Sequence, residues 1–267
     1  MNPRSLNDPD AGDRGFCGTI GDETEEERAM PRSRYPITRH VHRWGGLSTI
    51  ALSLAAIAAP APAQTAAEYR QQGLSLREQA RYPEAIAALQ TAVQLEPTNL
   101  SGRVLLGWTQ HKAGQATAAA ATLSQTLQQN PFAVPTLNAL GIVYLVNGDL
   151  PQAIAAHTWA AMLKPDNEIA YYNLSLAFER IQQYDWAIAT AQTATQLEPT
   201  NPHPPVAAAI AHWGNQEQSQ AQAAFRQAIA RDGRYADAAF LTYLDEAGFS
   251  AAQIQTAQTV LASLSPN

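Results

Sequence analysis

The sequence is poor in charged residues and in cysteine. Charged residues make up 15% of the 267 residues, well below the roughly 25% of an average soluble domain. The 17 Lys and Arg against 23 Asp and Glu leave a formal net charge of −6. A nucleic-acid-binding surface needs a concentration of basic side chains, so this composition argues against such a partner. The single cysteine, Cys17, excludes an intramolecular disulfide and a metal site built from several cysteines.

Motifs of catalysis are also missing. The chain has no glycine-rich phosphate loop, no HExxH and no GxSxG motif. Four histidines (His111, His157, His203 and His212) lack the spacing of metal ligands, and His157 falls in a column of core residues. We therefore expect no enzymatic activity, no cofactor and no metal. With 46% hydrophobic residues, the chain can still bury a large core.

The first 63 residues differ from the rest. Residues 1–29 are polar and acidic and favour a disordered extension, with Met30 as an alternative start. Residues 30–63 contain four arginines, an apolar run over 45–60 and then Ala61-Pro62-Ala63, which is the order of a secretory signal peptide. As a helix this run would be about 24 Å long, short for a hydrocarbon core of about 30 Å. We expect cleavage after Ala63 and export to a periplasm or lumen; an uncleaved membrane anchor and a cytosolic chain are the alternatives.

The remainder repeats with a period of 34 residues. The sequence EPTN occurs at 96–99 and again three periods later at 198–201. Prolines, glycines and alanines recur at the same period: Pro97, Pro131, Pro165 and Pro199; Gly73, Gly107 and Gly141; Ala85, Ala119, Ala153, Ala187 and Ala221. Repetition at a fixed period of this length is typical of a solenoid.

Each repeat has the pattern of two helices. In residues 168–201, Tyr171, Leu174 and Phe178 share one helical face, and Gln182-Gln183 forms a polar break. A second apolar stripe follows, and Pro199 ends it because the residue before a proline avoids the helical conformation. Such a hairpin leaves an apolar face that only its neighbour can cover, so the repeats are expected to stack.

These motifs resemble the tetratricopeptide repeat family. The third repeat supplies the family's residues with Leu140-Gly141, Tyr144, Ala153, Ala160 and Pro165, and the first and fourth repeats supply them as well. The resemblance implies an all-α, right-handed superhelical solenoid of helix-turn-helix repeats. Five repeats are expected at 66–99, 100–133, 134–167, 168–201 and 202–235, within 64–235, and residues 236–265 are expected to form a degenerate sixth hairpin or C-terminal cap.

The resemblance also implies that the first helix of each repeat lines a concave groove that binds a protein or peptide partner. The ninth position of each repeat is apolar: Leu74, Trp108, Ile142, Leu176 and Ile210. These residues either pack neighbouring first helices together or form an exposed ridge for a partner segment. The full set of candidate groove residues is Arg70, Leu74, Trp108, His111, Lys112, Asn138, Ile142, Tyr172, Asn173, Leu176, Arg180 and Trp213.

The sequence thus predicts a non-catalytic scaffold for protein–protein interaction, serving the assembly or organisation of an extracytoplasmic complex. One alternative is an assembly factor held in the membrane by the uncleaved N-terminal helix; another is the regulatory subunit of an enzyme. A membrane enters only if the signal segment stays attached, and no nucleic acid is expected. The pattern leaves the identity of the partner and the oligomeric state open.

Overall fold

The computed structural model describes residues 64–264, and the expected acidic extension and signal peptide lie outside them. Every regular element in this part of the chain is a helix. In chain order these are α2 (Ala66–Glu78), α3 (Tyr82–Leu95), α4 (Leu100–Lys112), α5 (Ala116–Gln129), α6 (Val134–Asn147), α7 (Leu150–Leu163), α8 (Glu168–Arg180), α9 (Tyr184–Leu197), α10 (His203–Gly214), α11 (Gln218–Arg231), the 3₁₀ helices η1 (Gly233–Ala236) and η2 (Phe240–Asp245), and α12 (Ala251–Ala262).

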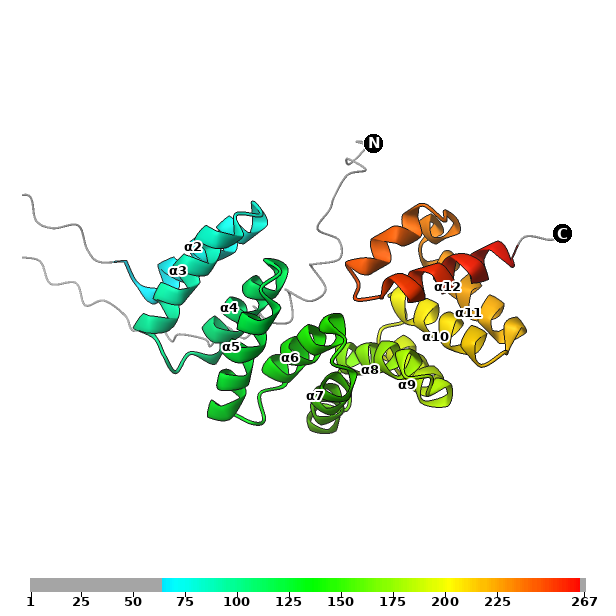
Figure 1. Cartoon of the computed structure of the whole chain (residues 1–267), viewed down its shortest axis with the longest axis horizontal. Coiled ribbons are helices and arrows are strands. Elements are labelled where there is room, and N and C mark those ends of the chain that lie inside the picture. Colours follow the sequence, from blue (N-terminus) through cyan, green and yellow to red (C-terminus); the bar gives the residue numbers. More distant parts are fainter. Residues whose placement is uncertain (1–63, 265–267) are drawn as a thin grey trace, which may run out of the picture.

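The helices form five successive hairpins, and each expected 34-residue range contains one of them. Each hairpin packs against the next, and the pairs follow one another along an arc from α2 to α11 (Figure 1). The prediction of an all-α solenoid is therefore confirmed. Among the described residues, no helix combines the length and the apolar character needed to cross a membrane.

A glycine in the first helix allows close contact with the second helix in the first three hairpins. A Cβ atom on Gly73 would lie 2.6 Å from Leu89, and one on Gly107 would lie 2.6 Å from Leu123. These distances are too short for any side chain larger than hydrogen. The recurring glycines thus let a large residue of the second helix fill the space between the two axes.

The turn inside each hairpin has the same backbone conformation. Its key residue has a positive φ in all five hairpins: Ala80 (56°), Gly114 (73°), Gly148 (85°), Gln182 (61°) and Gln216 (63°). This left-handed conformation ends the first helix and turns the chain back antiparallel. Only two of the five are glycines, so the other three hold a conformation that a side chain disfavours.

Small residues line the helix crossings. The alanine column Ala85, Ala119, Ala153, Ala187 and Ala221 is completely buried. The largest apolar cluster extends from the end of α6 through α8 and α10 to the C-terminal elements, and it includes Leu241, Leu244 and Phe249. The C-terminal elements therefore share one core with the repeats.

The C-terminal region has two parts with different positions. Helix α12 begins with a capping box between Ser250 and Gln253 and packs against α10 and α11, where it covers the end of the array. Before it, the expected first arm of a sixth hairpin is the six-residue 3₁₀ helix η2 rather than an α-helix. A short loop containing Gly248, whose φ is +85°, connects η2 to α12.

Candidate functional site: the inner face of the helix array

The first helices of the hairpins lie on the inner side of the arc. Helices two apart in the chain contact each other along this side: α4 with α6, α6 with α8, and α8 with α10. The second helices have no comparable contacts with one another, which places them on the wider, outer side. We call the surface formed by α2, α4, α6, α8 and α10 the inner face. All twelve candidate groove residues belong to these five helices.

Part of the inner face is covered by the chain itself. Residues Phe240–Gln253, here called the C-terminal segment, contact α8, the end of α6 and the end of α4. The Tyr172 hydroxyl donates a 2.6 Å hydrogen bond to the Ala247 carbonyl oxygen. The Gln253 amide donates to the Leu176 carbonyl at 3.1 Å and to the Glu179 carboxylate at 2.8 Å.

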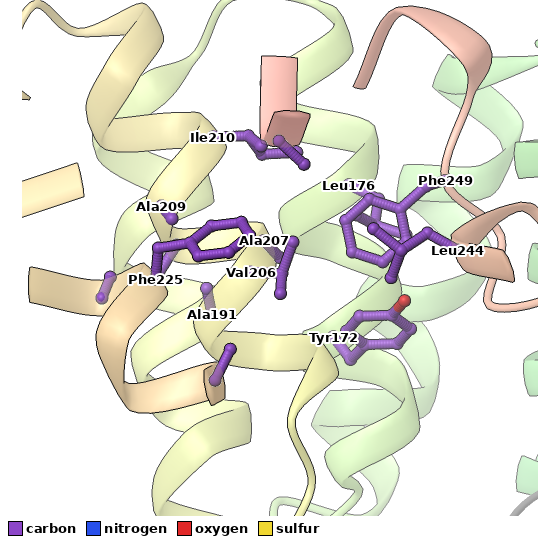
Figure 2. Close-up of a cluster of buried hydrophobic side chains, with 14 of the residues drawn as sticks. Tyr172, Leu176, Ala191, Val206, Ala207, Ala209, Ile210, Phe225, Leu244 and Phe249 are labelled. Carbon is purple, nitrogen blue, oxygen red and sulfur yellow. The ribbon is translucent and has the colours of Figure 1, made fainter. Parts of the chain in front are cut away.

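Apolar contacts accompany these hydrogen bonds. Phe249 is 4% exposed, and its ring centroid lies 6.1 Å from that of Tyr172. Leu244 and Leu176 are also buried. Figure 2 shows Leu244 and Phe249 close to Leu176, with the Tyr172 hydroxyl pointing toward them. The C-terminal segment therefore has apolar anchors as well as hydrogen bonds to backbone carbonyls.

An ion pair links the middle of the segment to the second repeat. The Lys112 ammonium lies 3.2 Å from the Glu246 carboxylate. The Glu246 side chain is 53% exposed, so the pair contributes little stability.

Three titratable groups of α8 and α10 are held in their neutral forms. Burial, followed by the nearby Tyr235 and Glu168, raises the pKa of the Tyr172 phenol well above its usual value of 10, so it remains a hydrogen-bond donor. Burial lowers the pKa of the His203 imidazole to about 4. Burial and then the charge of Glu198 raise the pKa of Glu168 to about 8, and the Asn201 amide donates to both carboxyl groups. These three groups therefore add no charge to the inner face near neutral pH, and the other ionisable groups that the segment contacts directly are Lys112 and Glu179.

Several polar candidate residues are engaged within the fold. Arg70 pairs with Glu96 at 2.5 Å, and this hydrogen bond, with one from Asn99, holds the pKa of Glu96 below its usual range. Asn138 and Asn167 exchange two amide hydrogen bonds of 3.2 and 3.0 Å. These contacts connect the beginning and the end of a repeat.

The fourth repeat engages its polar candidates in the same way. The Arg180 guanidinium donates to the Leu145 carbonyl at 2.5 Å, so it reaches back to the preceding repeat. The Asn173 amide donates to the Ile169 carbonyl at 2.8 Å. Tyr172, Asn173 and Leu176 are all buried, and the inner face here is not the open groove that the resemblance implied, because the C-terminal segment lies across it.

The apolar candidates differ in how much they contribute to the core. Leu74 and Trp213 are half-buried and pack against apolar clusters. Trp108 is 7% exposed, and its ring centroid lies 5.0 Å from that of His111. The pKa of His111 is lowered, first by burial and then by the charge of Lys112. Ile142 is half-buried and belongs to none of the apolar clusters of the described residues.

Sequence reasoning missed the residues that cover the inner face. Ala247, Phe249 and Gln253 lie in the range expected to form a cap, and no 34-residue column includes them. Their contacts join residues more than 70 positions apart, and helical periodicity carries no information about such pairs. The described residues contain no group of His, Cys, Asp and Glu able to hold a metal ion.

Comparison with known proteins agrees with the helix pattern. Two models described as tetratricopeptide repeat match residues 76–140 and 138–202. The phagocyte signaling-impaired protein of Aedes aegypti is 25% identical over 125 residues, which cover 47% of this chain. The match spans only 13% of that relative's length.

Solved structures give the same architecture. The MamA fragment 41-end from Desulfovibrio magneticus RS-1 has a TM-score of 0.58 at 19% identity, covering 64% of this chain and 97% of that one. A crystal structure of MamA gives 0.55 at 21%, covering 64% and 93%. A thermophilic TPR protein of Thermus thermophilus gives 0.55 at 19%, covering 68% and 99%. The helix hairpins, their 34-residue period and the two matching models establish that the chain belongs to the tetratricopeptide repeat family.

Proposed function

We propose that the protein is an exported scaffold that binds a segment of a partner protein on its inner face. The observation that supports this proposal most directly is the C-terminal segment, since a stretch of polypeptide already lies on part of that face. It contributes an aromatic anchor, and a backbone carbonyl that accepts from Tyr172. These are the contacts by which a groove binds an unstructured peptide.

The ninth-position row suggests where a partner can be added. At its C-terminal end, Leu176 and Ile210 are fully buried in the cluster that includes Leu244 and Phe249. Toward the N-terminus, Leu74 and Ile142 remain half-buried. A partner segment with apolar side chains would extend along the row from the C-terminal segment toward Leu74 and remove these residues from water.

The weak charge of the chain suggests how the partner is recognised. Polar candidates such as Arg70 and Asn138 are already engaged in internal contacts, so affinity must come mainly from apolar contact and backbone hydrogen bonds. Binding of this kind depends little on salt, unlike binding steered by long-range charge.

One pair of variants tests the site. A partner identified by cross-linking in the native extracytoplasmic fraction is titrated against Ile142→Asp and against Leu95→Asp. Leu95, at the end of α3 and 53% exposed, is the control because it receives the same change on a second helix. The Ile142 variant should lose about 30-fold in affinity or more, as truncation of a binding hot spot does. Equal affinity of the Ile142 variant and the unaltered protein, at unchanged helix content, would rule out partner binding along the ninth-position row toward Leu74.

The compartment is a separate part of the proposal. The basic, apolar and small-residue order of 30–63 motivates it. N-terminal sequencing of protein from its own host should begin at or near Gln64. Protein that begins at Met1 or Met30 and occurs in the cytosol would refute export, and the same uncleaved protein in membranes would favour the anchored assembly factor.

A further inference from the structure

The C-terminal segment has features of a bound ligand. Its polar contacts to the inner face are the hydrogen bonds from Tyr172 and Gln253 and the ion pair with Lys112, and its apolar contacts centre on Leu244 and Phe249. The 34-residue pattern does not extend into it, and six of its residues form a 3₁₀ helix, a conformation that proteins use in short pieces.

The segment is held at both ends and is exposed where it leaves the array. Before it, Tyr235 is 2% exposed, and the intervening residues 236–239 are all exposed. After it, Ala257 and Val260 of α12 are fully buried, and Gln222 of α11 donates to the Ser263 carbonyl at 2.9 Å. Tyr235 and the second half of α12 thus have contacts of their own, and displacement of the segment between them would expose Leu241, Leu244 and Phe249, which are now buried.

Four consecutive residues, Glu246 to Phe249, make an ion pair, a hydrogen bond and an aromatic contact that a peptide ligand could reproduce. Glu246 pairs with Lys112, and the Ala247 carbonyl accepts from the Tyr172 hydroxyl. Gly248 has a φ of +85°, which only glycine adopts without strain, and this turn directs Phe249 onto Tyr172. The recognised pattern is an acidic residue, any residue whose carbonyl is free, a glycine and an aromatic residue.

We propose that the inner face over α6 and α8 is a binding site for an acidic-x-Gly-aromatic segment of a partner protein, and that the chain's own residues Glu246–Phe249 occupy it until that partner displaces them. This inference rests on the proposed function, because it specifies what the inner face binds and when. Displacement makes the apparent affinity of the partner lower than its intrinsic affinity, in proportion to the fraction of molecules whose site is open.

The experiment uses the full chain and a fluorescent synthetic peptide of residues 240–253 as the probe. Phe249→Ala removes the aromatic anchor of the internal segment and leaves α6 and α8 unaltered. The variant should bind the probe about 10-fold more tightly than the unaltered chain, because more of its sites are open. Gly248→Ala, which strains the turn without removing the anchor, should change affinity in the same direction. Circular dichroism and hydrogen exchange of residues 254–262 verify that α12 stays docked in both variants.

A second change identifies where the probe binds. Tyr172→Phe, made in the Phe249→Ala chain, removes only the hydroxyl that donates to Ala247 and should weaken the probe about 3- to 10-fold. A probe carrying alanine in place of Phe249 should bind neither chain. Equal probe affinity for the unaltered and the Phe249→Ala and Gly248→Ala chains would overturn the proposal, as would an unchanged affinity after Tyr172→Phe.

The outcome also separates this inference from the proposed function. If the cross-linked partner depends on Ile142 but the probe is insensitive to Phe249 and Tyr172, the scaffold function stands and the displacement is wrong. Chains that bind the probe only by exchanging segments within a dimer would make a second copy the occupant, and this would also overturn the proposal. Partner binding that is lost with Tyr172→Phe and unaffected by Ile142→Asp would support the site over α6 and α8 and refute the extension toward Leu74.

Discussion

Replacement of His157 by leucine should stabilise the protein. His157 is fully buried, and its ring fills the space beside Gly141, where a Cβ atom would lie 2.5 Å away. In the first two repeats the equivalent residues, Leu89 and Leu123, are equally buried against Gly73 and Gly107. Neither ring nitrogen of His157 has a hydrogen-bond partner of good geometry among the described residues, although the Gly141 backbone lies next to the ring.

The expected gain at neutral pH follows from these contacts. A buried polar group without a partner costs about 1–3 kcal/mol, and leucine has a shape that two neighbouring repeats already accommodate at this position. We expect His157→Leu to raise the free energy of unfolding by about 1–3 kcal/mol at pH 7.5. In a chain of this length, each kcal/mol corresponds to about 2–4 °C in Tm.

The pH dependence gives a sharper test. Burial lowers the pKa of His157 to about 3 in the folded protein, opposed only in part by the Gly141 backbone, whereas an unfolded histidine titrates near 6.5. The unfolded chain therefore binds the proton first, and the unaltered protein loses stability as the pH falls from about 6.5 toward 3, by about 1.4 kcal/mol per pH unit. Leucine removes this loss, so the advantage of the variant should grow by about 2 kcal/mol between pH 7.5 and pH 5.

Urea unfolding followed by circular dichroism at the two pH values measures both effects. The matched control is Leu123→His, which places the same side chain at the same position of the second repeat. It should lower stability and introduce the pH dependence that His157→Leu removes. A variant that is less stable than the unaltered protein, or one whose advantage is the same at both pH values, would refute the reasoning.

Three further predictions concern the repeats. Ala187→Leu should overpack a fully buried helix crossing and cost about 1–3 kcal/mol in urea unfolding, whereas Ala189→Leu on the exposed side should cost little; equal costs would contradict the packing described here. Gln182→Gly should stabilise the protein by about 0.5–1 kcal/mol, because Gln182 has a φ of 61° and glycine adopts this left-handed conformation without the strain that a side chain causes. A lower Tm of the variant would contradict this. Because the folded Glu168 carboxyl keeps its proton up to a pKa of about 8 and the unfolded one releases it near 4.5, its contribution to stability falls as the pH rises through this window. The stability of Glu168→Gln relative to the unaltered chain should therefore increase from pH 5 to pH 8.5, and a constant difference would count against a buried, protonated Glu168.

Much of the fold could be predicted because repetition multiplies weak signals. A single Ala153 says little, but alanine at five positions 34 residues apart indicates one helix crossing made five times. Local patterns also decide where helices end, as at Pro199. The sequence signal is weaker at the turns, where Ala80 and Gln216 adopt the left-handed conformation without being glycine. Tertiary packing of the two helices imposes that conformation on whichever residue occupies the position.

The inner face could be located by the same periodicity, but the segment that covers part of it could not be predicted. Periodicity specifies which side of α8 carries Tyr172 and Leu176, because that depends on residues three and four positions apart. The C-terminal segment lies against that side through contacts between distant parts of the chain, such as Phe249 with Tyr172. Such a contact occurs once in the chain and leaves no repeated pattern in the sequence. In a solenoid the ends are therefore the least predictable parts, because only there can a segment outside the repeat meet the face that all repeats share. For this protein, the segment that meets it carries Phe249, and the hydrogen bond from Tyr172 to Ala247 makes the availability of the inner face a property of the C-terminal residues as much as of the repeats.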